Sequence, residues 1–140
     1  MTTRAGHVDS QQASRLNWFK NTAYPAAPTN TYLALYAGSM PKSDGTGGNE
    51  ISPASRPAIT FGAVATDANG RHYMSNNAVN SITLTNTSQA EVIGFGIMSA
   101  TSGGTPYYSD RFPAPFPVAA GATISIPAGA IRVFAEPATI

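Results

Sequence analysis

The sequence predicts a mainly β fold: an antiparallel β-sandwich or jelly-roll-like domain with one short N-terminal helix. Two patterns carry the prediction. About seven or eight short segments alternate apolar and polar residues, and turns rich in Gly and Pro separate them. The length of 140 residues suits one domain that can bury a core. We expect an N-terminal tail at residues 1–9 and a single domain at residues 10–140.

The one helical segment is expected at about residues 10–20. Asp9 and Ser10 offer an N-cap, and neither Gly nor Pro occurs in the segment that follows. Leu16 and Phe19 would share an apolar face, so we expect the helix to cover one end of a sheet. The residues before it are interpreted as a tail that can reach a neighbouring molecule, with a frayed terminus as the alternative.

A Pro-rich link at residues 24–28 leads to the first predicted strand, at residues 29–36. There Leu33 and Leu35 share one side and Tyr36 lies on the other. The stretch from about residue 38 to 57 is dense in Gly, Ser, Pro and Asn, which predicts a long surface loop. Loops of this length tend to be functional or to meet a partner.

Four more strands are predicted at residues 58–65, 71–75, 81–85 and 91–98. Asn69-Gly70 separates the first two and is typical of a hairpin turn. In the last segment, Ile93, Phe95 and Ile97 alternate with smaller and apolar residues, so both faces are apolar and a central strand is expected. In Gly94-Phe95-Gly96, we expect the two glycines to let a large residue of a facing element approach the strand.

The C-terminal part of the chain predicts three more strands. Residues 106–110 form a short one. Proline at positions 113, 115 and 117 then predicts an irregular edge at residues 112–117. Residues 122–126 and 130–135 are predicted as strands joined by a turn at residues 127–129.

Charge is scarce in this chain and evenly spread. Charged residues make up 11%, against roughly a quarter in typical soluble domains, and the net charge is +1. The basic residues do not cluster, which argues against nucleic acid and membrane partners. The polar, weakly charged composition is typical of β surfaces and of faces buried between subunits. No membrane span or signal peptide is expected, so we expect assembly in a cytoplasm.

The residues that usually carry catalysis are few and isolated. There is no cysteine, and neither His7 nor His72 has further metal ligands at a suitable spacing, so no metal and no cofactor are expected. The seven acids are dispersed, and only Asp44 and Glu50 share a loop. An enzyme would need Asp44, Glu50 or Asp110 in a convergent site that the sequence does not suggest. We therefore predict a protein without catalytic residues.

Tyrosines offer one alternative, a sugar-stacking platform. The candidates are Tyr24, Tyr32, Tyr36, Tyr107 and Tyr108. Alternation along the strands places about half of them in the core, so carbohydrate binding stays the less favoured interpretation.

Several segments, in this order, resemble a family of small phage virion proteins often labelled tail fibre or tail proteins, which includes capsid cement and decoration proteins. The matching features are the helix with Leu16 and Phe19; residues 31–36; residues 47–52 leading to Arg56 and residues 59–61; residues 95–98 followed by 102–104; and residues 120–131. Two features depart from the family pattern. Ala54-Ser55 stands where an aromatic residue usually precedes the arginine, and the usual charge near Gly121 is absent.

The resemblance implies a β-sandwich that oligomerises, binds other virion proteins and has no enzymatic residues. We expect a capsid cement protein, with a trimer favoured, that binds the major capsid protein and bridges capsomers on the capsid surface after assembly in the host cytoplasm. The alternative is a tail fibre or host-adhesion module that binds a surface receptor or glycan.

Overall fold

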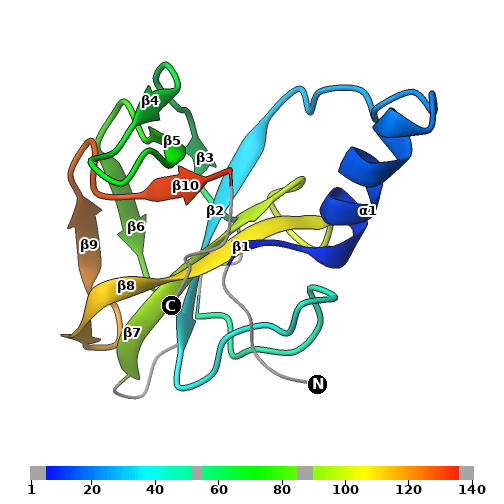
Figure 1. The fold of residues 1–140 in the computed structure, drawn as a ribbon. Coiled ribbons are helices and arrows are strands. Elements are labelled where there is room, and N and C mark those ends of the chain that lie inside the picture. Colours follow the sequence, from blue (N-terminus) through cyan, green and yellow to red (C-terminus); the bar gives the residue numbers. More distant parts are fainter. Residues whose placement is uncertain (1–5, 52–54, 85–89, 136–140) are drawn as a thin grey trace.

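A computed structural model describes residues 6–51, 55–84 and 90–135 of the chain. It confirms a mainly β, sandwich-like fold of antiparallel sheets with one short helix in the described residues (Figure 1). The elements are β1 (Gly6–His7), α1 (Asp9–Phe19), β2 (Thr31–Ala37), β3 (Ala58–Ile59), β4 (Ala65–Thr66), β5 (His72–Ser75), β6 (Asn80–Thr83), β7 (Ala90–Met98), β8 (Pro106–Val118), β9 (Thr123–Ile126) and β10 (Arg132–Phe134). Within these residues no helix is long and apolar enough to cross a membrane.

The largest sheet has five strands in the order β1-β8-β7-β2-β3. Strand β7 lies between β8 and β2, which confirms the predicted central strand. At one edge, Gly6 and His7 pair with Ser109 and Tyr108 of β8, and Val8 is buried. The predicted tail at residues 1–9 is therefore wrong for residues 6–9, which belong to this sheet edge and to α1; residues 1–5 lie outside the described part.

Two smaller sheets, β10-β5-β4 and β6-β9, lie together beside the large sheet (Figure 1). A single apolar cluster joins all three sheets. Its buried members include Leu33 and Leu35 from β2, Phe95 and Ile97 from β7, Ile82 from β6, Ile126 from β9 and Val133 from β10. Burying these side chains removes apolar surface from water, which is the main force that holds the sandwich together.

The opposite face of the large sheet has its own apolar cluster, formed by Ala34, Tyr36, Met40 and Met98. Glycines in β7 make room for it. A Cβ atom at Gly96 would lie 2.9 Å from the Tyr36 ring, and one at Gly94 would lie 2.5 Å from the Met40 sulfur. The predicted role of these glycines, to allow close approach of a large residue, is confirmed.

The alternation predicted for residues 91–98 is wrong at its beginning. The pairing of β7 with β8 shifts register between Val92 and Gly94. As a result Val92 joins Phe95 and Ile97 in the sandwich core, whereas Ile93 packs against the cluster on the other face. A bulge inserts one extra residue and so reverses the side on which the preceding residues point.

The stretch at 38–57 is not the free surface loop that its composition predicts. Met40, Pro41 and Ile51 are buried, and the chain returns alongside β2. The Ala37 amide donates to the Asn49 carbonyl at 3.0 Å, and the Ile51 amide donates to the Leu35 carbonyl at 2.9 Å. The buried residues anchor this segment to the sheet, while most of its other described residues stay exposed; residues 52–54 lie outside the described part.

A buried arginine fastens the end of that loop. Arg56 is only 7% exposed, and its Nε and Nη2 donate to the Glu50 carboxylate at 2.6 and 2.8 Å. Its Nη1 donates to the carbonyls of Ala100 and Gly103 at 2.9 and 2.8 Å. Because every one of these bonds is charge-assisted, they offset much of the cost of burying the guanidinium.

Two strand predictions need correction. Residues 58–65 form only the short strands β3 and β4, because the chain leaves the five-stranded sheet after Ile59 and enters the three-stranded sheet at Ala65. Residues 106–118 form one strand, β8, in place of a short strand and an irregular edge. Its pairing nonetheless jumps from Gly94–Arg111 to Val92–Phe116, so Pro113 and Pro115 fall in an unpaired bulge.

Candidate functional site

The most unusual surface of the molecule is formed by helix α1 and the link that follows it. Leu16, Trp18 and Phe19 are 68%, 59% and 77% exposed, and Tyr24 is 45% exposed. We call these four residues the helix patch. No residue of α1 is buried, so the prediction that Leu16 and Phe19 cover the end of a sheet is wrong.

Polar side chains, not apolar ones, attach α1 to the sheets. Gln12 donates to the His7 carbonyl at 2.8 Å, and Arg15 Nη1 donates to the Ala135 carbonyl at 2.6 Å. The Nε2 atom of His7 lies 3.0 Å from the Phe134 carbonyl and 3.1 Å from Arg15 Nη2. Burial, with a smaller contribution from the Arg15 charge, holds the pKa of His7 below its ordinary value. The ring is therefore kept neutral at this junction.

The ends of α1 are defined by the backbone. The Val8 carbonyl accepts the first helical bonds, and no side chain caps the helix, so the predicted cap by Asp9 or Ser10 is wrong. At the other end Asn21 has a positive φ of 61°. Its amide donates to the Trp18 carbonyl, and the Thr22 amide donates to the Asn17 carbonyl. This is a Schellman motif, which gives the chain a defined turn directly after the apolar residues.

The Trp18 and Phe19 side chains meet edge to face, with ring centroids 5.2 Å apart. Leu16 precedes Phe19 by three residues, so these two lie on neighbouring positions of the helix surface. Figure 1 shows α1 at the opposite side of the molecule from the two small sheets. The helix itself is attached to the end of β10 by the bond from Arg15 to the Ala135 carbonyl.

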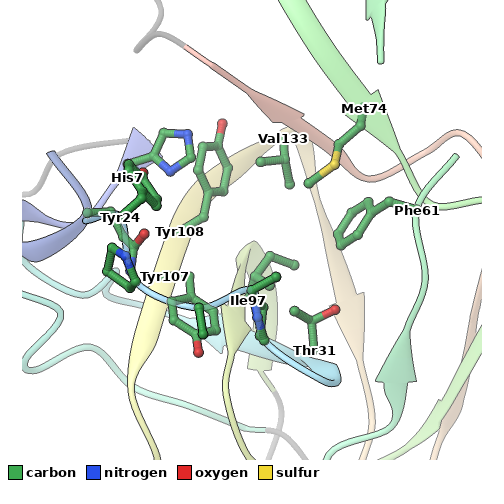
Figure 2. Close-up of a pocket in the computed structure, with 14 residues that line it drawn as sticks. His7, Tyr24, Thr31, Phe61, Met74, Ile97, Tyr107, Tyr108 and Val133 are labelled. Atoms are coloured by element: carbon green, nitrogen blue, oxygen red, sulfur yellow. The ribbon is translucent and has the colours of Figure 1, made fainter. Parts of the chain in front are cut away.

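An apolar pocket of about 410 Å³ lies beside the helix patch (Figure 2). The link at residues 24–28 forms one wall, and Tyr24 belongs to both the pocket and the helix patch. Tyr107, Ile97 and Val133 line it from the sheets. Few polar groups face it, so a ligand would meet mainly apolar and aromatic surface there.

Two of the polar rings that line the pocket, His7 and Tyr108, have hydrogen-bond partners within the chain. The Tyr108 hydroxyl lies 3.3 Å from Asp110 Oδ2 and accepts from the Phe134 amide at 3.3 Å, and burial raises the pKa of Tyr108. His7 serves the junction with α1 described above. Among the described residues that line the pocket, neither the His7 ring nor the Tyr108 hydroxyl is paired with a nucleophilic side chain.

The acids singled out from the sequence do not come together. Asp44 accepts bonds from the Thr46 amide and hydroxyl within its own turn, at 2.9 and 2.6 Å. Glu50 pairs with Arg56, as described above. Burial raises the pKa of Asp110, against the lowering effect of a bond from the Arg111 amide. No group of three His, Cys, Asp or Glu residues that could hold a metal occurs within residues 6–51, 55–84 and 90–135.

The five candidate tyrosines divide as the alternation predicts. Tyr36 and Tyr108 are buried in the two apolar clusters, and Tyr32 is partly buried. Tyr24, Tyr107 and Tyr108 come together at the apolar pocket, but Tyr108 is buried there. Tyr24 and Tyr107 keep exposed surface. They are the remaining candidates for contact with a ligand.

The helix patch was missed by sequence reasoning, which expected Leu16 and Phe19 to cover the end of a sheet. One signal could have found it. Gln12, Arg15, Leu16 and Phe19 fall on one helix face, so this face is polar at first and apolar only toward the end of the helix. A mixed face of this kind can be attached by hydrogen bonds.

The chain matches the family model described as Podophage GP4 fiber I protein gp80 over residues 8–134. It is therefore a structural protein of a phage virion. More particularly, it belongs to the gp80 family of podophage fibre proteins. No curated protein matches the chain.

Proposed function

We propose that this chain is a subunit of a phage fibre. The observation that carries the proposal is the match to a fibre protein family, which extends over nearly all of the described residues. A capsid cement role, in which the chain binds the major capsid protein and bridges capsomers, is the second candidate. It is supported by the low charge and by the resemblance of the sequence segments quoted above.

The described surface favours contact with other proteins over catalysis. The helix patch exposes four large apolar side chains, three of them on α1. Large apolar patches on a folded protein are typical of interaction sites. The candidate acids Asp44, Glu50 and Asp110, in contrast, bond to groups of the chain itself, which supports a role in protein contacts.

Attachment to a host receptor is a natural further role for a fibre subunit. Tyr24 and Tyr107 at the apolar pocket supply the aromatic surface that a glycan or an apolar side chain of a receptor would contact. A glycan array probed with the purified chain tests this role. Saturable binding that is lost in Tyr107→Ala would support it, and no binding would restrict the chain to assembly.

Location in the particle distinguishes the two candidates. Antibodies raised against the purified chain and coupled to gold should label the tail region of intact particles in electron microscopy. Particles that lack the protein provide the control, and they should resist heat and osmotic shock as well as complete ones. Gold spread over the shell, together with fragile deficient particles, would overturn the fibre proposal in favour of cement.

A further inference from the structure

We propose that the apolar pocket between the link at residues 24–28 and the sandwich binds a small, uncharged aromatic molecule. The inference goes beyond the fibre role, because it rests on the pocket alone. Four features support it: the depth of the pocket, the chemistry of its walls, the neutral polar groups that line it and the way in which the link is attached.

The pocket is deep enough to remove a ligand from water. Its volume of about 410 Å³ lies within the range of about 300–1,000 Å³ that is typical of small-molecule sites. Ile97, Tyr108 and Val133 line it and are buried, so they form its floor. Figure 2 shows the labelled side chains arranged around an open space. Water against such an apolar surface makes few hydrogen bonds, so a ligand that displaces this water gains free energy.

Aromatic rings and one sulfur atom form the walls of the pocket. Phe61, Met74 and Tyr107 pack against the sandwich core and keep part of their surface exposed. Figure 2 shows Phe61 and Met74 across the open space from Tyr24. Rings favour edge-to-face and offset contacts with other rings, and methionine sulfur makes favourable contacts with ring edges. An aromatic ligand can use these contacts, whereas an aliphatic chain gains only from the burial of its surface.

The polar groups that line the pocket are neutral. None of the described residues that line it is Asp, Glu, Lys or Arg, and the His7 ring is neutral, as described above. A charged ligand would therefore lose its hydration without gaining an ionic partner. In the described part of the chain, no hydrogen bond engages the side chains of Gln11, Tyr24 or Tyr107. These groups can bond to a hydroxyl, amine or carbonyl group of an uncharged ligand.

The link gives the pocket a wall that can adjust to a ligand. Within the described residues, positions 24–28 make no hydrogen bond to the rest of the chain. Pro25 and Pro28 restrict the backbone of the link itself. The link can therefore shift against a ligand without breaking a hydrogen bond.

Titration of the purified full chain with the uncharged dye N-phenyl-1-naphthylamine tests the proposal. We expect saturable binding of one dye per chain, measured as a rise in dye fluorescence. The sulfonated form of this dye, 8-anilinonaphthalene-1-sulfonate, should bind at least about tenfold more weakly, because the pocket offers its negative charge no partner. Tyr107→Ala should weaken binding of the uncharged dye about tenfold, since it removes one aromatic wall. Tyr73→Ala, at a partly buried position that does not line this pocket, is the matched control and should bind like the wild type.

Methyl NMR locates the uncharged dye without any substitution. The dye should shift the methyl signals of Met74, Ile97 and Val133, which line the pocket. The signals of Ile82 and Ile126 should stay in place, because these residues belong to the same core but do not line the pocket. Absence of saturable binding overturns the proposal, as do equal affinities for the two dyes or shifts at Ile82 and Ile126 as large as those at the pocket. Gold labelling of particles tests the fibre role separately, so failure of either idea can be recognised.

Discussion

Helix α1 and the loop at residues 38–57 are anchored to the sheets in different ways. The loop is rich in Gly, Ser and Pro, yet it buries Met40, Pro41 and Ile51 and ends in the buried Arg56. The helix contains Leu16, Trp18 and Phe19, yet none of its residues is buried. The loop is anchored by a few buried side chains, although most of its described residues are exposed. The helix is anchored by polar side chains and leaves its large apolar ones exposed.

The difference between the two segments shows that the available partners decide which side chains are buried. Arg56 can be buried because Glu50 and two carbonyls accept from it. The helix can leave its apolar side chains exposed because Gln12 and Arg15 hold it to the sheets. Composition reports which groups favour burial, but the partners available in space decide which groups are buried.

The largest expected effect is on the loop side, from Arg56→Ala. The change removes the two hydrogen bonds that Nη1 donates to the Ala100 and Gly103 carbonyls, and it removes the ion pair with Glu50. We expect a loss of about 3 kcal/mol in the free energy of unfolding, near the lower end for a broken buried pair because the Glu50 side chain is 30% exposed and can be hydrated. Urea unfolding measures it. Arg111→Ala, at an exposed position, is the control. Equal losses in the two variants would show that the buried Arg56–Glu50 pair contributes no more to stability than an exposed arginine does.

A matched pair of substitutions compares the two regions directly. Met40→Ala should cost about 2–3 kcal/mol, because it leaves a cavity between the loop and the sheet. Leu16→Ala should change the stability of the monomer by less than about 0.5 kcal/mol, since its side chain is already in solvent. Thermal unfolding at low protein concentration gives both values. A larger loss for Leu16→Ala than for Met40→Ala would reverse the comparison.

Close packing beneath the loop is tested by Gly96→Ala. The new Cβ would lie 2.9 Å from the buried Tyr36 ring, which must shift, so we expect a loss of about 1–2 kcal/mol. Gly62→Ala is the control, because the nearest atom to its Cβ would be 3.8 Å away. Chemical unfolding of both variants should separate them. If Gly96→Ala is as stable as Gly62→Ala, the cluster around Tyr36 is looser than described.

The smallest effect is expected on the helix side, from acidification. The pKa of His7 is lowered from 6.5 by burial and by Arg15, so the folded chain favours the neutral ring. The stability that this provides is complete above pH 6.5. It is lost as the pH falls below 6.5 toward the lowered pKa, because the unfolded chain takes up the proton first. The decrease in Tm between pH 7.5 and 5.5 should be smaller in His7→Gln. An identical decrease would contradict the role of His7 at the α1 junction.

Much of the fold follows from the sequence, because strand alternation is a local signal. The alternation of Leu33 and Leu35 with Tyr36 correctly separates the two faces of β2, and the apolar run around Phe95 correctly predicts a central strand. The ion pair between Glu50 and Arg56 is not predicted. It depends on carbonyls of the turn at residues 100–103, which are distant in sequence.

The helix patch could not be predicted from local pattern for a similar reason. Whether Leu16 and Phe19 are covered depends on where α1 is attached, and that attachment depends on Arg15 reaching the Ala135 carbonyl, 120 residues away. Hydrophobic residues in a short helix indicate a preference for burial, but the local pattern does not say what would cover them. The composition therefore indicates faces buried between subunits, but it does not say where on the fold they lie.

Hydrogen–deuterium exchange of the full chain, followed at low and high protein concentration, tests the central comparison most directly. We predict slow exchange at both concentrations for the loop-side amides of Ala37, Asn49 and Ile51, which donate to backbone carbonyls. The amides of α1, none of whose residues is buried, should exchange faster than these. Helix amides that are as protected as the loop amides would contradict the account.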